Sequence, residues 1–212
     1  MIAQDNSLFE THSRNYLSWA KRYDKIFNAE LKALKQMVPQ NGKGMEMDLG
    51  VGQYAIPLGI KYGTEASREL RSIASKRGLT VSDIQMGKLP YESNQFDFVL
   101  LLFNVLTMED INNKIHEISR VLKKGGSLII AFLDKTAFDK KPESYQKSLL
   151  YFYEKVKFLT TDSILSVLNK FGYADFSFVQ TFSQNPDDSS FVEEPKNGYG
   201  EGVLVIMKVS KK

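Results

Sequence analysis

The chain lacks cysteine, contains only two histidines and carries little net charge. Its 212 residues include 28 Lys and Arg against 25 Asp and Glu, a formal net charge of +3 that is spread along the sequence. Without cysteine there is no disulfide or thiolate ligand, and His12 and His116 alone offer little material for a metal site or a histidine-based triad. A charge this small and this dispersed does not indicate a nucleic-acid partner. Any chemistry therefore has to come from other residue types, and no metal is expected.

Long apolar runs are also missing. No stretch approaches the roughly 20 apolar residues that span a bilayer, and residues 1–10 lack the basic start and apolar core of a signal peptide. We therefore expect a cytoplasmic protein with no membrane partner. Its hydrophobic fraction of 42% suffices for a substantial core, and its length suits a single domain over residues 1–212.

Helix and strand patterns alternate along most of the chain. Apolar residues recur at helical spacing from Tyr16 to Val38, which predicts an amphipathic N-terminal helical segment that ends at Pro39. Further helices are predicted near residues 70–76, 111–122 and 165–171, and a short one at 53–58 that Pro57 would shorten or distort. The predicted strands are residues 45–49, 59–64, 79–84, 96–103, 127–133, 173–182 and 202–209.

The strand patterns indicate how the sheet is built. Residues 96–103, FDFVLLLF, are apolar throughout, as expected of a central strand that is covered on both faces. The last two strands have no helix between them, so they are most simply antiparallel neighbours. The predicted fold class is α/β: a three-layer sandwich around a mostly parallel seven-stranded sheet with an antiparallel C-terminal strand pair. Such sheets bind ligands at the carboxyl ends of their strands.

The segment MEMDLGVGQY at residues 45–54 gives the strongest indication of a ligand site. It has the pattern of a buried strand that opens into a glycine turn, which is where α/β proteins bind nucleosides. Gly50 and Gly52 lack a Cβ, so the backbone can turn sharply there and approach a ligand closely. Asp48 and Tyr54 stand at the two positions where a third glycine could be, so this motif by itself is a weak signal.

Several features together resemble the class I S-adenosylmethionine-dependent methyltransferases. These are the order of elements, the glycine turn, an acidic residue after the second strand, FDFV in the fourth strand and RVLKKGGSLII at residues 120–130. The last feature is the most specific, because LKxGG followed by a strand is rare in dehydrogenases. The resemblance covers residues 42–209. It implies a Rossmann-like core at residues 42–212, a helical cap at residues 1–40, S-adenosylmethionine as the cofactor, and methyl transfer by in-line displacement.

The resemblance fits the glycine turn in two registers. In the first, which the downstream QYAIPL favours, Glu46 is the acidic residue of the family motif and Asp48 replaces the first glycine. In the second, Asp48 is the acidic residue and Tyr54 replaces the third glycine. In both, the backbone N–H groups of Gly50 and Gly52 would approach the methionine part of the cofactor, while Glu46 would orient the turn and the cofactor's amino group. A carboxylate at position 48 repels the cofactor's own carboxylate unless it turns toward the ammonium or sulfonium group.

Other cofactor contacts are implied at the ends of the second and third strands. Glu65 would accept hydrogen bonds from both ribose hydroxyls, with Ala66 near the ribose and adenine. The alternative for Glu65 is a solvated glutamate at a helix start, where the helix dipole favours an anion. Gln85 would meet the edge of the adenine and Met86 its face, unless the two residues form a simple loop with a methionine that faces the core.

The resemblance also implies where the methyl acceptor binds. Phe103 would lie at the methyl-donor end of the cofactor, and Asn104 beside it would contact the substrate or serve only as a turn residue. Tyr16, Trp19 and Tyr23 form an aromatic stripe that is core on one side and would line the substrate pocket on the other. The segment FNVL after the fourth strand differs from the NPPY-like segment of nucleic-acid amino methyltransferases. We therefore expect a small-molecule substrate.

Two other functions are compatible with the same sequence. A non-catalytic descendant of the family would keep the fold as a binding module with a degraded cofactor site, and Asp48 in the glycine motif motivates that alternative. A nicotinamide oxidoreductase shares the first strand, turn and helix, but its sheet would not end in an antiparallel pair.

Overall fold

The computed structural model of the protein describes residues 24–84, 87–103, 108–153, 156–186, 188, 191 and 193–212. Its helices are α2 (Asp24–Met37), α3 (Arg68–Lys76), α4 (Met108–Val121), α5 (Lys135–Asp139), α6 (Glu143–Phe152) and α7 (Thr161–Lys170). Its strands are β1 (Gly44–Met47), β2 (Tyr62–Thr64), β3 (Thr80–Ser82), β4 (Phe96–Leu102), β5 (Leu122–Asp134), β6 (Phe158–Leu159), β7 (Tyr173–Thr181), β8 (Lys196–Asn197) and β9 (Leu204–Lys211).

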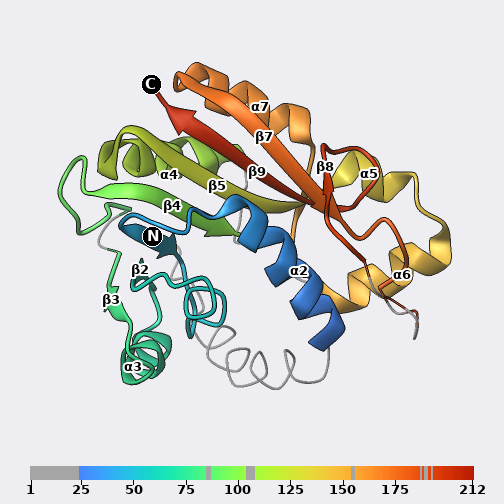
Figure 1. Ribbon diagram of the computed structural model, residues 1–212, viewed down its shortest axis with the longest axis horizontal. Coiled ribbons are helices and arrows are strands. Elements are labelled where there is room, and N and C mark those ends of the chain that lie inside the picture. The colour runs from blue at the N-terminus through green and yellow to red at the C-terminus, as the bar shows by residue number, and fades with distance from the viewer. Residues whose placement is uncertain are drawn as a thin grey trace.

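A single sheet forms the centre of the molecule (Figure 1). It contains nine described strands in the order β3-β2-β1-β4-β5-β9-β7-β8, with β6 beside β5. The neighbouring pairs β3–β2, β2–β1, β1–β4 and β4–β5 are parallel, whereas β9 is antiparallel to both β5 and β7. Apart from β6 and β8, which have two residues each, the sheet has the predicted seven strands and the predicted antiparallel C-terminal pair.

Two apolar cores lie on opposite faces of the sheet and give the fold its three layers. Along β5, Leu128 and Ile130 belong to one core, and Ile129 and Ala131 belong to the other. This alternation is the two-residue period of a strand that is covered on both faces. Residues of α2, α3, α5 and α6 complete one core, while residues of α4 and α7 complete the other. In Figure 1, α2 crosses the near face of the sheet.

The strand β4 lies between β1 and β5, as its apolar sequence predicts. Six of its seven residues are buried, and only Asp97 is partly exposed. The order of the strands reverses between β1 and β4, since β2 and β3 extend the sheet to one side and β5 extends it to the other. Ligands of α/β sheets bind at such a switch point, outside the carboxyl ends of the strands. This geometry places the glycine turn after β1 at the expected ligand-binding edge.

The segment that follows this turn is not the helix predicted at residues 53–58. The N–H groups of Ile56 and Leu58 donate to carbonyls four residues back, both at 3.1 Å, but Pro57 between them has no N–H to donate. The N–H of Ile60 then donates to the carbonyl five residues back. The prediction of a helix is therefore wrong, because the proline leaves only a series of turns.

The sequence also gave no prediction for α5, α6 and β6, which are short and follow one another between residues 135 and 159. A buried carboxylate organises this region. Oδ1 of Asp134 accepts a hydrogen bond from the N–H of Ala137 at 2.7 Å, and Oδ2 accepts one from the N–H of Thr161 at 2.9 Å. Asp134 therefore holds the starts of both α5 and α7, a tertiary contact that no local pattern reveals.

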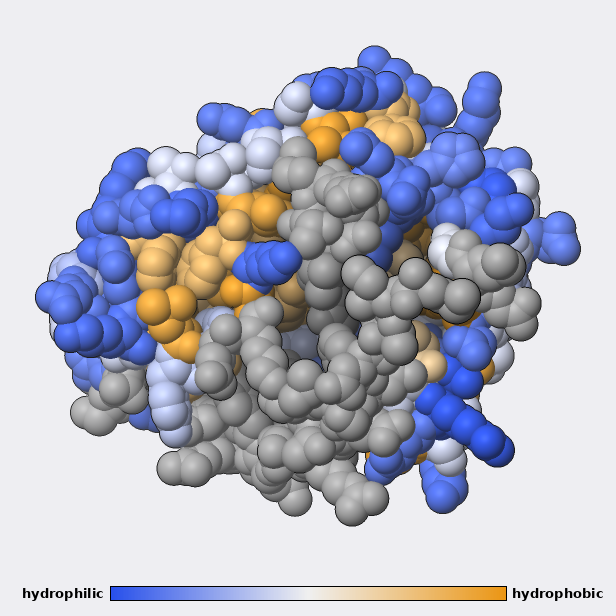
Figure 2. Space-filling model, turned by 180° about the vertical axis from the view of Figure 1, so that it is seen from behind, coloured by the Kyte–Doolittle hydropathy of each residue, from blue (hydrophilic) through white to orange (hydrophobic). Residues whose placement is uncertain are grey.

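The surface combines polar and apolar areas. Figure 2 shows hydrophilic residues around the rim of one face, with apolar residues gathered in areas closer to the middle. The large apolar side chains that are most exposed are Ile56, Leu150, Tyr151 and Tyr199. Among the described helices, none is long and apolar enough to cross a bilayer.

Gly63 of β2 provides a test of how closely β1 and β2 must pack. A Cβ at this position would lie 2.6 Å from the carbonyl oxygen of Glu46 and 2.1 Å from Cδ2 of Leu49. Because a backbone oxygen cannot move aside as a side chain can, we expect Gly63→Ala to lower the free energy of unfolding by about 1–3 kcal/mol in urea denaturation. The exposed Ser72→Ala is the control, with an expected change within about 0.5 kcal/mol. Equal stability of the two variants would contradict this packing.

Candidate functional site

In the turn after β1, every second residue from position 48 to position 52 has a left-handed backbone conformation. Asp48, Gly50 and Gly52 have φ angles of 57°, 60° and 77°. Aspartate tolerates this region better than most residues, so the turn keeps its shape without a glycine at position 48. Phe103, which follows the neighbouring strand β4, also has a positive φ, of 46°. The chain therefore turns sharply at the carboxyl ends of both strands that flank the switch point.

The two glycines of the turn have different roles. Among the described residues, a Cβ on Gly50 would have only Oε1 of Gln53 within 4 Å, at 3.8 Å, so this part of the chain leaves the space above Gly50 open. A Cβ on Gly52 would lie 2.1 Å from Cδ1 of the buried Leu79, and its N–H already donates to the carbonyl of Leu49 at 2.9 Å. Gly50 therefore leaves room for the close approach of a ligand, whereas Gly52 leaves room for the side chain of Leu79.

Glu65 connects this turn to the next strand. It follows β2 directly and is buried, with Oε2 accepting from the N–H of Gly50 at 2.9 Å and Oε1 accepting from the N–H of Ser67 at 2.8 Å. Nη1 of Arg71 donates to the carbonyl oxygens of Glu65 and Ala66 at 2.7 and 2.6 Å. The Glu65 carboxylate thus ties the turn after β1 to the end of β2, and the Arg71 guanidinium fixes the segment that follows β2. The sequence did not indicate this role of Arg71.

Three carboxylates gather around the turn: Glu46, Asp48 and Glu65. Burial raises the pKa of Glu46 well above its usual value, a hydrogen bond from the Ala55 N–H opposes the shift, and the charges of Asp48 and Glu65 add to it. Burial is also the main cause of the raised pKa of Glu65. Within the described part of the chain, Oε2 of Glu46 has no hydrogen-bond partner. A ligand that brings positive charge and hydrogen-bond donors would stabilise this cluster.

Asp48 is not left as an uncompensated charge. Its Oδ2 accepts from Nζ of Lys114 on α4 at 2.8 Å, and both side chains are about one-fifth exposed, at 20% and 19%. The pair draws the carboxylate toward α4. An ion pair that is partly shielded from solvent compensates the added negative charge at the position of a missing glycine.

A further buried carboxylate lies on α2. Glu30 is completely buried and accepts hydrogen bonds from the hydroxyl of Tyr54, at 2.5 Å, and from the hydroxyl of Tyr153. Burial raises its pKa to about 7, although the two hydroxyls act in the opposite direction. The ring of Phe103 lies 6.2 Å from that of Tyr54 and 5.7 Å from that of Tyr153. The cluster therefore adjoins the end of β4.

Glu30 was not among the predicted site residues, although the sequence carries a signal for it. Ile26, Ala33 and Leu34 on α2 are buried at helical spacing, and Glu30 lies on the same face of the helix. A carboxylate on the apolar stripe of an amphipathic helix has to find a partner in the core. Tyr54 entered the sequence analysis only as a replacement for glycine.

The predicted site residues fall into two groups. Those that the structure describes lie at the carboxyl ends of β1, β2 and β4: Glu46, Asp48, Gly50, Gly52, Glu65, Ala66 and Phe103. The others lie outside the described residues: Tyr16, Trp19, Tyr23, Gln85, Met86 and Asn104.

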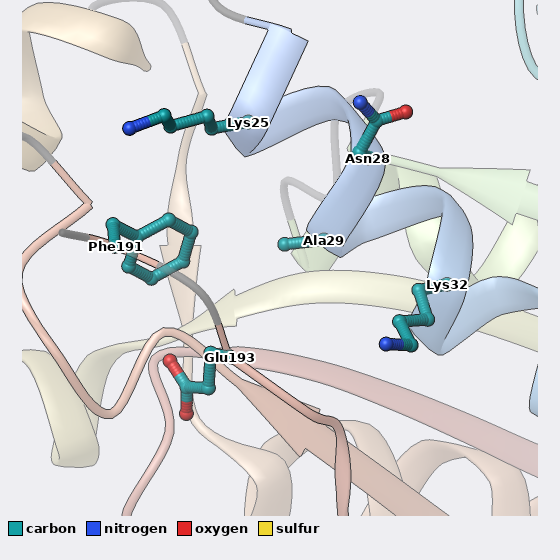
Figure 3. Close-up of a pocket in the computed structure, with 6 residues that line it drawn as sticks. All are labelled: Lys25, Asn28, Ala29, Lys32, Phe191 and Glu193. Atoms are coloured by element: carbon teal, nitrogen blue, oxygen red, sulfur yellow. The ribbon is translucent and has the colours of Figure 1, made fainter. Parts of the chain in front are cut away.

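A separate cavity of about 210 Å³ lies against α2 (Figure 3). Ala29 and Phe191 face each other across it, with Lys25 and Lys32 on the helix side and Glu193 on the opposite side. The polar groups at its edge already have partners, since Lys32 pairs with Glu194 and the carboxylate of Glu193 accepts from the N–H of Ser183. Of the predicted site residues that the structure describes, none lines this cavity.

The fold and the site together define a Rossmann-like α/β protein with a glycine turn at the edge where such sheets bind ligands. Its sheet has a switch point between β1 and β4, an open glycine at the end of β1 and an acidic residue at the end of β2.

Comparisons with known proteins identify the family. A family model described as "Methyltransferase domain" matches residues 46–130. An uncharacterized protein of Methanocaldococcus jannaschii is 33% identical over 205 residues, which are 97% of this chain and 99% of that protein. An uncharacterized methyltransferase of Bacillus cytotoxicus is 29% identical over 161 residues, covering 68% of this chain and 76% of that protein.

A solved structure extends the match over nearly the whole chain. It is an S-adenosylmethionine-dependent methyltransferase of Thermotoga maritima, described as a "possible histamine N-methyltransferase", with 33% identity and a TM-score of 0.85. The similarity covers 98% of this chain and 100% of that one. The chain belongs to the class I S-adenosylmethionine-dependent methyltransferases, so it is an enzyme whose cofactor is S-adenosylmethionine. The prediction from the sequence of an S-adenosylmethionine-dependent methyltransferase is thereby confirmed.

The raised pKa of Glu30 predicts a pH-dependent stability. The native state holds this proton up to a pKa of about 7 against an ordinary value of 4.5, so its contribution to the free energy of unfolding falls as the pH rises through this window. Glu30→Gln does not titrate there. Between pH 4.5 and 7.5, the stability of the unmodified protein relative to this variant should decrease by on the order of 3 kcal/mol in urea denaturation. A difference independent of pH would rule out the shift.

Proposed function

We propose that the protein transfers a methyl group from S-adenosylmethionine to a small-molecule acceptor, and that the turn at residues 48–52 and Glu65 hold the cofactor. The supporting observation is the junction of these two segments, where the Glu65 carboxylate meets the N–H of Gly50 at 2.9 Å. Parallel neighbours β1 and β2 bring them to the same edge of the sheet. No step of the reaction requires a cysteine or a histidine.

The residues present fit this cofactor. Glu65 would accept hydrogen bonds from the ribose hydroxyls, because each carboxylate oxygen can accept more than the single N–H that it now receives. The open space above Gly50 would admit the methionine part. The free Oε2 of Glu46 would accept from the cofactor's amino group, which satisfies a buried acceptor that has no partner among the described residues.

The positive φ angles support the first of the two sequence registers. They occur at positions 48, 50 and 52, so that Asp48 takes the place of the first glycine and Glu46 acts as the acidic residue. Tyr54, which would replace the third glycine in the second register, is buried with its hydroxyl on Glu30. Ala66, Gln85 and Met86 remain the residues predicted to surround the ribose and adenine.

The reaction depends mainly on the orientation of the acceptor relative to the methyl group of the cofactor. The cofactor supplies a methyl group on a sulfonium, which is transferred by in-line displacement. The protein has to align the acceptor with that group and exclude water, and these two effects can supply much of the rate. Phe103, at the end of β4, is suited to both tasks, because its half-buried ring packs between the rings of Tyr54 and Tyr153.

A small-molecule acceptor remains the proposal for the substrate. Tyr16, Trp19, Tyr23 and Asn104 are the residues predicted to line its pocket. The description of the Thermotoga maritima relative as a possible histamine N-methyltransferase accords with a small acceptor. Neither a nucleic-acid partner nor a location other than the cytoplasm is expected from the sequence.

Calorimetry with S-adenosylmethionine and S-adenosylhomocysteine tests the cofactor site. We expect Glu65→Gln to weaken binding by about 10–100-fold, since the charged acceptor for the ribose hydroxyls is lost and the amide nitrogen meets a backbone N–H. Glu69→Gln, on the outer part of the same helix start, should bind as the unmodified protein does. If the unmodified protein bound neither compound at millimolar concentration, the proposal would fail.

The ion pair at position 48 generates a separate prediction. Lys114→Met leaves the Asp48 carboxylate without its cation beside the carboxylate of the cofactor, so affinity for S-adenosylmethionine should fall by about 3–10-fold. Asp48→Gly/Lys114→Met removes both charges and should restore it. An unchanged affinity in the single variant would mean that Asp48 does not act on the cofactor.

A further inference from the structure

Glu30 is a buried carboxyl group whose hydrogen-bonding capacity is only partly used by the described residues. Its two oxygens each accept from one tyrosine hydroxyl, whereas an ionised carboxylate offers about four acceptor positions. Among the described residues, no positively charged side chain acts on its pKa. Because buried charges are normally paired, this carboxylate lacks the cation that would compensate it within the described chain.

Aromatic rings extend on both sides of this carboxylate. Consecutive ring centroids lie 5.2 Å apart for Phe27 and Tyr54, 6.2 Å for Tyr54 and Phe103, and 5.7 Å for Phe103 and Tyr153. The run continues from Tyr153 to Phe182 at 6.2 Å. The faces of such rings attract cations, and the attraction is strongest where water is excluded.

This cluster borders the position of the transferred methyl group. Tyr54 is the second residue after Gly52, and Phe103 directly follows β4, where the acceptor meets the cofactor under the proposed function. Phe103 is the half-buried ring between the two tyrosines that hold Glu30. An acceptor that stacks on Phe103 would therefore have the Glu30 carboxylate and two phenolic oxygens beside it.

We propose that the methyl acceptor is a small organic amine and that Glu30, with Tyr54 and Tyr153, selects it by binding its nitrogen. This inference rests on the proposed function. An ammonium group supplies both the positive charge and the donors that the cluster lacks. A neutral hydroxyl acceptor supplies no charge, and a carboxylate acceptor adds a second negative charge to a site that excludes water.

The cluster also provides an acceptor for the proton that the ammonium group has to lose before methyl transfer. An ammonium group has no free electron pair, so it first gives one proton to the Glu30 carboxylate and becomes a neutral amine. The nitrogen lone pair then forms the N–C bond while the S–C bond breaks, and the electrons of that bond convert the sulfonium to a thioether. The methylated amine leaves as an ammonium ion, and Glu30 returns its proton to water.

A panel of acceptors tests the selectivity on the unmodified protein. Small aliphatic and aromatic amines are each paired with the alcohol and the carboxylate of similar skeleton, for example 2-phenylethylamine, 2-phenylethanol and phenylacetate. We expect amines to bind the complex with S-adenosylhomocysteine, and to be methylated with S-adenosylmethionine, about 10–100-fold better than their partners. Equal or better use of the alcohols or carboxylates, or no amine binding at millimolar concentration, overturns the proposal.

Variants separate a binding role from a structural one. Glu30→Gln keeps the shape of the side chain and should lower kcat/KM for the best amine by at least about tenfold, with calorimetric binding of S-adenosylmethionine unchanged. Glu117→Gln is the matched control, since Glu117 is a buried carboxylate on α4, on the opposite face of the sheet, with Arg120 as its partner. Equal losses in the two variants would overturn the role of Glu30.

The pH profile supplies a readout that a structural role would not move. Tyr54 and Tyr153 are the described groups that face Glu30, and both lower its pKa. The acid limb of kcat/KM should lie near pH 7, disappear in Glu30→Gln and move to higher pH in Tyr153→Phe, where one of these hydroxyls is lost. An acid limb that stays in place in both variants overturns the proposal. Failure of the cofactor to bind the unmodified protein would instead refute the proposed function.

Discussion

The carboxylate of Glu65 joins the two chain segments on which the cofactor site depends. It accepts hydrogen bonds from the N–H of Gly50, in the turn after β1, and from the N–H of Ser67, at the start of α3. These two segments are adjacent only because β1 and β2 are parallel neighbours. Both bonds are largely shielded from water, so the N–H groups would be costly to leave unsatisfied. The shape of the glycine turn is therefore a property of two strands rather than of the glycine motif alone.

Much of the fold was predictable because the strands carry strong local patterns. The apolar run of β4 and the absence of a helix between β7 and β9 were enough to predict the middle of the sheet and its antiparallel end. The predictions failed where a single residue or a distant contact overrides the pattern. Pro57 removes one N–H and with it a helix, and Asp134 organises a region of short elements from within the core.

The site was predictable to a lesser degree, because its residues act through contacts between distant positions. The glycine turn and Glu65 follow from spacing, and the structure describes both at one edge of the sheet. The charge on Asp48 seemed a defect in the sequence because its partner, Lys114, belongs to another helix. Gly52 is predicted to contact the cofactor, and the structure adds that its lack of a Cβ makes room for Leu79. In each case the missing information is the identity of a neighbour in space.

The hydrogen bonds of Glu30 restrict how a small molecule can enter the protein. They tie α2 to the segment after the glycine turn and to the segment after α6, through two tyrosines that are themselves buried. Lifting α2 from the sheet would break both of these hydrogen bonds of a carboxylate that is otherwise surrounded by the core. Helix α2 is therefore a fixed wall of the interior, and a route of entry that passes beneath it would be the costliest one for the enzyme to open.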